Sequence, residues 1–281
     1  MRVYGALVRL LVLAFVAIAA CGDSTDAPPP TQFGTAERPV TLQVPANYDS
    51  AKHYPLLMVL HGYSVTGFIQ EAFFGVKAEV MAGNAFVIAP DGLTDSTGNP
   101  FWNADPECCD FDHTNVDDVG YLGKILDDVT AAYPIDHVWL IGHSNGGYMA
   151  YRMACDRADI VENILVLAGN AATTACNPTQ PVEVLHMHGD QDMTVPFAST
   201  AERSVDQWAV HDGCGTTFHA GPSYDLDGTQ PGAETSSQIA DGCPAGIDLE
   251  LWTIAGAGHI PNYNASFEPT AYQWFLDHPR P

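Results

Sequence analysis

The sequence G-H-S-N-G, residues 142–146, places a serine at a sharp turn between two elements. Residues 138–141 form an apolar run typical of a buried strand, and a helical pattern begins at Gly146. Gly142 and Gly146 let the backbone pass close to the neighbouring strand and helix, because neither has a side chain. The pattern predicts a nucleophile elbow that exposes the Ser144 hydroxyl, although a serine that only caps the helix fits the same five residues.

A serine hydroxyl needs a histidine to accept its proton and a carboxylate to orient that histidine. Behind a nucleophile elbow the chain order is serine, then acid, then histidine. His259 follows the last apolar strand in a glycine-rich loop, whereas His278 lies in the terminal helix. The acid is expected in H-G-D-Q-D, where Asp192 stands further into the loop than Asp190. Asp192 is therefore the predicted acid, and Asp190 is the alternative.

Backbone amides are expected to stabilise the negative charge that develops on the attacked carbonyl oxygen. Asn145 directly follows the serine, and Tyr63 lies in the H-G-Y turn after an earlier apolar strand. We predict that the amides of these two residues form an oxyanion hole. His61, His143 and His188 are interpreted as structural residues that pack or hydrogen-bond.

Aromatic residues are candidates for binding an acyl group in a cleft beside the serine. The predicted substrate-binding residues are Phe101, Trp102 and Tyr148. The alternative for all three is packing in the core, and for Tyr148 the two interpretations have equal weight. Asp117 and Asp118 are interpreted as capping or bracing a helix. No ligand set for a metal accompanies these residues, and acyl transfer through a serine needs no cofactor.

Strand-like and helix-like segments alternate along the chain, which predicts the elements that position these residues. An amphipathic segment at residues 116–133 has helical spacing. Apolar runs rich in Val, Ile and Leu, typical of buried parallel strands, occupy residues 54–62, 84–92, 137–144, 163–169, 182–190 and 247–256. The expected fold is α/β, with a doubly wound, mostly parallel sheet. Ser144 and the motifs H-G-Y, G-D-Q-D and G-A-G-H all fall at the carboxyl ends of strands, where ligands bind such sheets.

The N-terminus has the pattern of an export signal. Arg2 and Arg9 lie at the start of an apolar run that is short for a membrane span and ends in small residues, which favours a signal peptide over a membrane anchor helix. The sequence I-A-A-C resembles a bacterial lipobox, so residues 1–20 are predicted to be removed and Cys21 to carry the lipid. Ordinary cleavage that leaves a free cysteine is the alternative. Anchoring through this lipid is the only membrane contact that we expect.

The composition excludes a nucleic-acid-binding protein. The 281-residue chain has a formal net charge of −24, and removing residues 1–20, with two arginines and no acid, makes it −26. Such a charge repels phosphate backbones. Residues 21–39 are polar and proline-rich, so we predict a flexible tether there and a catalytic domain over residues 40–281.

Six cysteines besides Cys21 suggest disulfides in an oxidising compartment. Cys155 with Cys176 and Cys214 with Cys243 are plausible pairs, the latter bracketing an excursion that contains Gly and Pro. For the adjacent Cys108 and Cys109 three possibilities remain: a strained disulfide between them, two free thiols, or a different pairing. Metal binding by this adjacent pair is less favoured, because no CxxC spacing or histidine cluster accompanies it.

Several motifs occur together in the order of a known family. The segments HGY, FWNADPECC, VDDVGYL, GHSNGGYMAYRMAC, HGDQDMTVP and GAGH resemble the polyhydroxybutyrate depolymerase and feruloyl esterase-like family of α/β-hydrolases, from about residue 40 to the end. This resemblance implies a catalytic triad of Ser144, Asp192 and His259 and the HG-type oxyanion turn. Family members often continue GGGHTWPG where this chain has GAGHIPNY, so the leaving-group side of the pocket is expected to differ.

These observations predict an exported or surface-anchored serine carboxylic-ester hydrolase that acts through an acyl-enzyme. The expected partner is a small or polymeric ester of the feruloyl, acetylxylan or polyhydroxyalkanoate type, and the sequence indicates no oligomeric state. A serine peptidase would use the same triad, and only the resemblance disfavours it. A non-catalytic binding protein is disfavoured because every catalytic part is present, and an interfacial lipase or cutinase because no long apolar lid segment stands out.

Overall fold

The computed structural model describes residues 29–171 and 173–280. The predicted signal peptide, Cys21 and the rest of the predicted tether up to residue 28 lie outside the described residues. Within the described part of the chain, no helix has both the length and the apolar character needed to cross a membrane.

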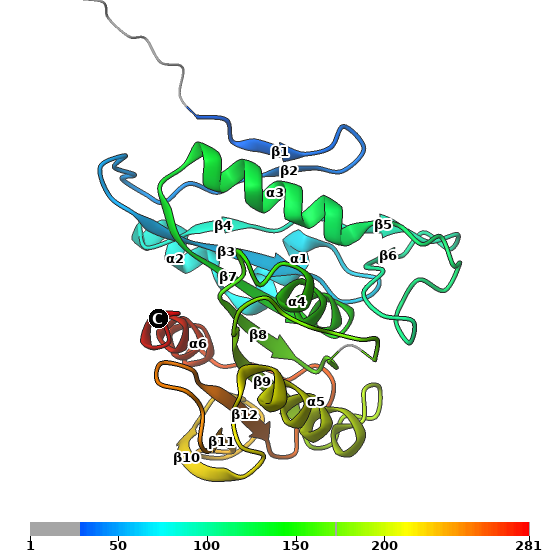
Figure 1. The fold of residues 1–281 in the computed structure, drawn as a ribbon, viewed down its shortest axis with the longest axis vertical. Coiled ribbons are helices and arrows are strands. Elements are labelled where there is room, and N and C mark those ends of the chain that lie inside the picture. The colour runs from blue at the N-terminus through cyan, green and yellow to red at the C-terminus, as the bar shows by residue number, and fades with distance from the viewer. Residues whose placement is uncertain (1–28, 172, 281) are drawn as a thin grey trace, which may run out of the picture.

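One eight-stranded sheet forms the centre of the molecule (Figure 1). Its strands, in spatial order, are β10 (Phe218–Tyr224), β11 (Thr235–Ala240), β12 (Leu249–Ile254), β9 (Glu183–Gly189), β8 (Asn163–Leu167), β7 (Ile135–His143), β3 (Tyr54–Leu60) and β4 (Phe86–Ile88). The six strands from β12 to β4 are parallel. Five of them fall within apolar runs that the sequence predicted, and β7 begins two residues before its run. The mostly parallel sheet is therefore confirmed.

Helices cover both faces of this sheet, as expected of a doubly wound fold. Along β3, Leu56 and Met58 face one core and Leu57 and Val59 face the other, because successive side chains of a strand point to opposite faces. The helices are α1 (Gly67–Phe74), α2 (Lys77–Ala82), α3 (Asp118–Ala132), α4 (Asn145–Asp156), α5 (Phe197–Asp212) and α6 (Phe267–Asp277). Helices α3, α4 and α5 bury their apolar sides in the first core, and α1, α2 and α6 in the second.

The sequence did not predict the two strands β10 and β11, which form the edge of the sheet beyond β12. β10 and β11 pair antiparallel with each other, and β11 pairs antiparallel with β12. The disulfide Cys214–Cys243 closes this excursion, and Cys155–Cys176 is also bonded, so both expected pairings are present. The two strands escaped prediction because β10 faces solvent and its residues have no continuous apolar pattern.

The N-terminal boundary of the folded domain also needs correction. β1 (Gln32–Gly34) and β2 (Pro39–Thr41) form a two-stranded antiparallel sheet inside the segment that we assigned to the tether and its junction. Phe33 is buried in the same core as Tyr121 of α3, and the Tyr121 hydroxyl donates to the Arg38 carbonyl. The ordered domain therefore begins some residues before Val40, because one aromatic side chain anchors the hairpin.

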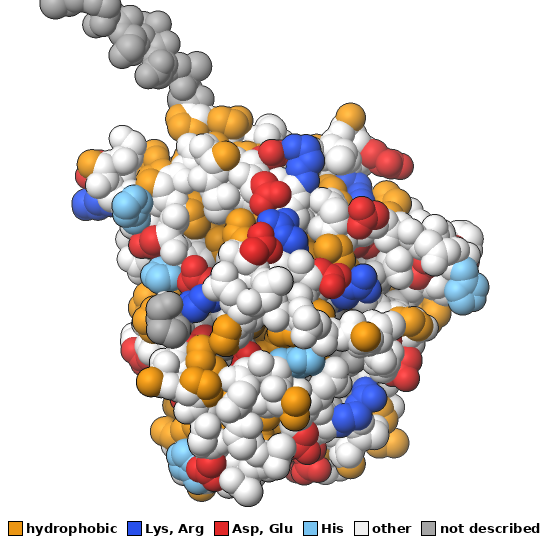
Figure 2. All heavy atoms as spheres, viewed as in Figure 1, with side chains coloured by type: hydrophobic (Ala, Val, Ile, Leu, Met, Phe, Trp, Pro, Cys, Tyr) orange, Lys and Arg blue, Asp and Glu red, His pale blue; other side chains and the backbone are white. Residues whose placement is uncertain are grey.

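The surface carries acidic and basic side chains that are interspersed on the face drawn in Figure 2. Ion pairs of the described residues include Lys124–Asp128, Arg152–Asp156 and the contact of Arg157 with Asp127. A short pair of strands, β5 (Leu93–Thr94) and β6 (Pro100–Phe101), completes the described architecture near the active-site end.

Two buried carboxyl groups lie at the end of the sheet opposite the strand ends that carry the candidate site. Glu183 begins β9 and accepts the Asp248 amide, and Asp212 ends α5 and accepts the Val182 amide. Burial raises the pKa of Glu183 to about 8 and that of Asp212 to about 7. Both groups are therefore neutral in the folded protein under mildly acidic conditions.

We predict that the free energy of unfolding falls as pH rises through the folded-state pKa values of Glu183 and Asp212. Because the folded-state pKa values lie above those of the unfolded chain, the stability is fully present below the unfolded-state pKa values and is lost progressively as pH rises from there to the folded-state values of about 7 and about 8. Glu183→Gln should reduce this loss, measured by urea unfolding at about pH 5.5 and about pH 9. The control is Glu202→Gln, an exposed carboxylate on α5. Parallel pH dependences of Glu183→Gln and wild type would contradict the prediction.

Candidate active site

Ser144 occupies a turn of one residue between β7 and α4. Its backbone has φ 54° and ψ −121°, a conformation that side-chain-bearing residues rarely adopt. A Cβ atom on Gly146 would stand 2.1 Å from the Leu60 carbonyl oxygen, and one on Gly142 would stand 2.2 Å from the Gly146 carbonyl oxygen. The expected reason for the two glycines, a close backbone approach on both sides of the serine, is therefore confirmed.

Asp192 and His259 meet above the ends of the adjacent strands β9 and β12. His259 Nδ1 lies 2.7 Å from Asp192 Oδ2, and the amides of Thr194 and Val195 donate to Oδ1 at 2.8 and 3.0 Å. Burial alone would raise the pKa of Asp192, but hydrogen bonds from His188 and His259 hold it well below its usual range. The carboxylate is thus ionised and held at both oxygens.

Asp190, the alternative acid, has a different partner. Its Oδ1 accepts the Gly256 amide at 2.8 Å, and its side chain is exposed. It therefore ties the loop after β9 to the loop after β12, and the structure brings Asp192 rather than Asp190 to His259.

Ser144 and His259 line one cavity of about 260 Å³. Its apolar wall consists of Val65, Ile69 and Phe73 on and before α1, with Ile260 on the other side. None of these four was predicted from the sequence. The available signals were the i, i+4 spacing of Ile69 and Phe73 just after the H-G-Y turn, and the position of Ile260 beside His259.

The two candidate oxyanion donors flank the serine. Neither the Tyr63 amide nor the Asn145 amide donates a hydrogen bond to any described residue. Asn145 is the first residue of α4, where amides are unpaired and the helix dipole favours negative charge. The neighbouring Gly62 amide donates to Gln70 Oε1 at 3.1 Å, so a buried side chain from α1 holds the turn that presents Tyr63.

His61 and His143 have the contacts of structural residues, as expected. His61 Nε2 accepts the Gly92 amide at 2.9 Å, so its Nδ1 carries the proton and donates to the Gly62 carbonyl. His143 Nε2 lies 2.9 Å from the His259 carbonyl oxygen, to which it donates. Burial lowers the pKa of His143 to about 4, so this imidazole is neutral while it holds the backbone of His259.

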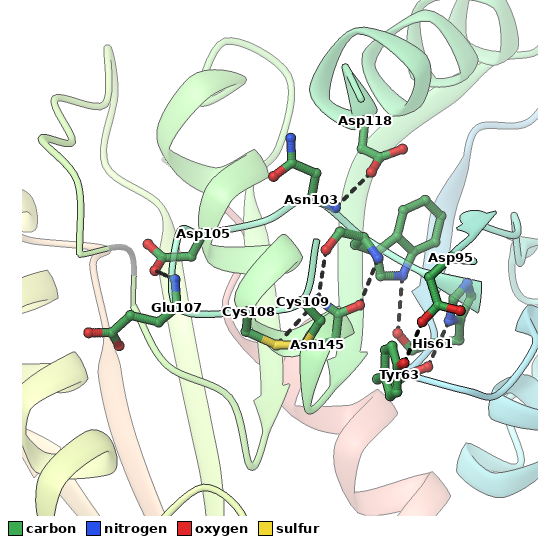
Figure 3. The surroundings of a disulfide bond; sticks show 12 residues. His61, Tyr63, Asp95, Asn103, Asp105, Glu107, Cys108, Cys109, Asp118 and Asn145 are labelled. Atoms are coloured by element: carbon green, nitrogen blue, oxygen red, sulfur yellow. Dashed lines mark hydrogen bonds between the residues drawn. A yellow bond between two sulfur atoms is a disulfide. The ribbon is translucent and has the colours of Figure 1, made fainter. Parts of the chain in front are cut away.

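The segment 101–109 packs beneath the elbow, which corrects the predicted substrate-binding residues. Asn145 exchanges two hydrogen bonds with the backbone of Trp102, and Trp102 Nε1 donates to the His61 carbonyl (Figure 3). Phe101, Trp102 and Tyr148 are 1%, 0% and 7% exposed, and none of them lines the cavity that holds Ser144. Phe101 and Trp102 are core residues because the segment folds under the turn instead of over it, and Tyr148 packs into the core from α4.

Cys108 and Cys109 are bonded to each other, the strained option among those left open. Asn145 Nδ2 lies 3.6 Å from Cys108 Sγ, so the disulfide packs against the residue that follows Ser144 (Figure 3). No group of His, Cys, Asp or Glu that could hold a metal occurs in the described ranges. Asp117 caps α3 through the Gly120 amide, and Asp118 pairs with Arg38 and accepts the Asn103 amide, as expected of capping and bracing residues.

The structure has the features that define an α/β-hydrolase fold. They are a mostly parallel sheet with helices on both faces, a serine on a one-residue strand-to-helix turn, and a histidine–aspartate pair after the later strands. Residues 33–224 match the family model Esterase, described as "Putative esterase", and the chain belongs to this family. The resemblance to feruloyl esterase-like α/β-hydrolases is confirmed, and the predicted esterase class is confirmed at the level of the family.

Relatives with curated names agree with this family. A protein of Aspergillus niger named "Probable feruloyl esterase C" is 28% identical over 63% of this chain and 63% of its own length. Feruloyl esterase D of Neurospora crassa is 25% identical over 83% of this chain and 77% of its own length. The match covers less than two thirds of the length of several relatives, including the first of these.

Among solved structures, an acetyl xylan esterase from Aspergillus awamori is similar to this chain. It has a TM-score of 0.62 at 16% identity, and the match covers 87% of this chain and 98% of that one. At this identity the similarity shows the shared fold.

We predict that Gln70→Met lowers kcat for ester hydrolysis about tenfold with little change in KM. The substitution removes the acceptor of the Gly62 amide, so the turn that presents Tyr63 loses one buried hydrogen bond, worth about 1 kcal/mol. Steady-state kinetics on p-nitrophenyl butyrate measure this effect. The matched control, Gln273→Met, lies on the exposed side of α6. Equal kcat values for Gln70→Met and the control would contradict the prediction.

Proposed function

We propose that this protein is a serine carboxylic-ester hydrolase in which Ser144, His259 and Asp192 form the catalytic triad. The observation that carries the proposal is the 2.7 Å contact of His259 Nδ1 with buried Asp192, beside a cavity that also holds Ser144 on its strained turn. The pairing leaves His259 Nε2 as the nitrogen that can take a proton from the serine. Membership of the esterase family supports the same reaction class.

The proposed reaction is acyl transfer in two halves. Ser144 Oγ attacks the ester carbonyl carbon while His259 takes the hydroxyl proton, and Asp192 stabilises the resulting imidazolium. The oxyanion accepts hydrogen bonds from the amides of Tyr63 and Asn145, and the C–O bond to the alcohol breaks as His259 returns the proton to that oxygen. Water then attacks the acyl-enzyme by the same route and releases the acid.

The cavity supports an ester with a short or flat apolar acyl group. Val65, Ile69, Phe73 and Ile260 present carbon surface beside Ser144, and Ile69 and Ile260 are 52% and 67% exposed at its mouth. Feruloyl, acetylxylan and polyhydroxyalkanoate esters all fall within this range. The curated relatives named as feruloyl esterases favour the first.

We also propose that the protein is exported and anchored through a lipid on Cys21. Three disulfides among the described cysteines support an oxidising compartment. The apolar leader before I-A-A-C supports a lipoprotein signal.

Ser144→Ala should abolish ester hydrolysis, with kcat lowered on the order of a million-fold. The substrates are p-nitrophenyl acetate, butyrate and octanoate, methyl ferulate and a hydroxybutyrate oligomer, and the order of kcat/KM values identifies the ester class. Ser199→Ala, an exposed serine on α5, is the control. Hydrolysis by Ser144→Ala at the wild-type rate would refute the assignment, and cleavage of peptides without cleavage of esters would favour the peptidase alternative.

Phe73→Ala should shift the acyl preference toward longer chains. The Phe73 ring packs against His143 and Tyr263 and bounds the cavity, so its removal makes room for additional methylene groups. We expect the ratio of kcat/KM for octanoate to that for butyrate to rise about tenfold. Phe73→Leu, which fills more of the space, should give a smaller rise. An unchanged ratio in Phe73→Ala would show that this wall does not contact the acyl chain.

A further inference from the structure

A buried row of side chains continues behind the proposed catalytic acid. Tyr151 of α4 and both His186 and His188 of β9 are fully buried. Tyr151 Oη lies 2.9 Å from His186 Nδ1, and His186 Nε2 lies 3.0 Å from His188 Nδ1. The row ends where His188 Nε2 lies 3.2 Å from Asp192 Oδ2 and 2.8 Å from the Val195 carbonyl oxygen.

When both imidazoles are neutral, the acceptors at the end of the row determine where every proton lies. His188 Nε2 faces a carboxylate and a carbonyl, which only accept, so this nitrogen carries the proton. In a neutral imidazole the other nitrogen then accepts, so His186 Nε2 must donate to His188 Nδ1. By the same reasoning Tyr151 donates its hydroxyl proton to His186 Nδ1. All three hydrogen bonds therefore point toward Asp192.

The surroundings favour a neutral His186 ring in this arrangement. Burial, with His188 beside it, lowers the pKa of His186 well below its usual range. The planes of the two imidazoles are 5° apart, which suits an in-line hydrogen bond between their edges. Trp208 packs against Tyr151 and Phe197 against His188, so apolar rings enclose the row. Apolar side chains would fill this space without needing hydrogen-bond partners. Burying these three polar side chains instead costs free energy of folding unless each of their hydrogen bonds is made.

We propose that Tyr151, His186 and His188 are positioning residues that orient the Asp192 carboxylate toward His259 through this one-way row of hydrogen bonds. The inference rests on the proposed role of Asp192 in the triad. The Nε2–H of His188 is shared between the Val195 carbonyl at 2.8 Å and Asp192 Oδ2 at 3.2 Å, and His259 contacts the same carboxylate oxygen, while two backbone amides hold Oδ1. Rotation of the carboxylate would break a bond to His188 as well as those to the amides. The row thus keeps Oδ2 in place while His259 gains and loses its proton.

The first test compares His188→Leu with His188→Gln. Leu removes the donor to Asp192, whereas the Gln amide can place an N–H near the position of the imidazole Nε2. On p-nitrophenyl butyrate we expect His188→Leu to lower kcat about tenfold or more with KM changed less than about twofold, and His188→Gln to recover most of kcat. Tyr151→Phe, which deletes only the first donor, should lower kcat by about threefold. Tyr272→Phe of α6 is the control, because among the described residues its hydroxyl donates to the Asn84 carbonyl, away from the row.

A double-mutant cycle with Asp192→Asn separates positioning from a general structural role. If His188 acts through Asp192, then adding His188→Leu to Asp192→Asn leaves kcat unchanged. A further fall in kcat by the full factor seen in the wild-type background would overturn the inference, as would equal impairment of His188→Leu and His188→Gln. Should His188→Leu fail to fold, wild-type kcat in Tyr151→Phe would overturn the row's role by itself.

The same cycle distinguishes this inference from the proposed function. Wild-type activity in Asp192→Asn alone would refute the triad assignment, whereas an impaired Asp192→Asn with additive effects of His188→Leu would refute only the positioning role. Thermal unfolding of each variant identifies any loss of activity that comes from loss of folded protein.

Discussion

The contact between the backbone of Gly146 and the Leu60 carbonyl is the constraint on which the candidate site depends. Helix α4 must begin one residue after β7 ends, and it must start against the end of β3. Only a residue without a side chain fits at Gly146, and the turn forces Ser144 into a positive φ. As a consequence, Ser144 lies outside both β7 and α4, and the Asn145 amide is left unpaired at the positive end of the helix.

Parallel strands bring together groups that are far apart in the chain. β9 and β12 are adjacent and in register from Leu249 with Val184 to Ile254 with Gly189, so the loops that follow them emerge side by side. The Asp190 carboxylate joins these loops by accepting the Gly256 amide, and Asp192 contacts His259. Asp190 thus has a structural role and Asp192 the proposed catalytic one.

Side chains beneath the surface connect the elbow to the oxyanion turn. Asn145 binds the backbone of Trp102, and Trp102 binds the carbonyl of His61. His61 in turn holds Gly62 and Gly92, and Gln70 holds the Gly62 amide. Because most of these groups are buried, each polar atom needs its partner, so the network resists displacement of either donor.

The sequence by itself determined the sheet's parallel strands, the elbow and the order of serine, acid and histidine. Those features depend on local patterns: apolar runs, glycines around Ser144, and loops that directly follow strands. Only the tertiary structure decided which apolar residues face the cavity, because Trp102 and Ile260 are equally apolar in sequence and differ in what packs over them. It also decided the edge strands β10 and β11 and the early start at β1, and it brings Asp192, the acid that the sequence already favoured, to His259. Each of these depends on contacts between segments distant in the chain, which no local pattern encodes.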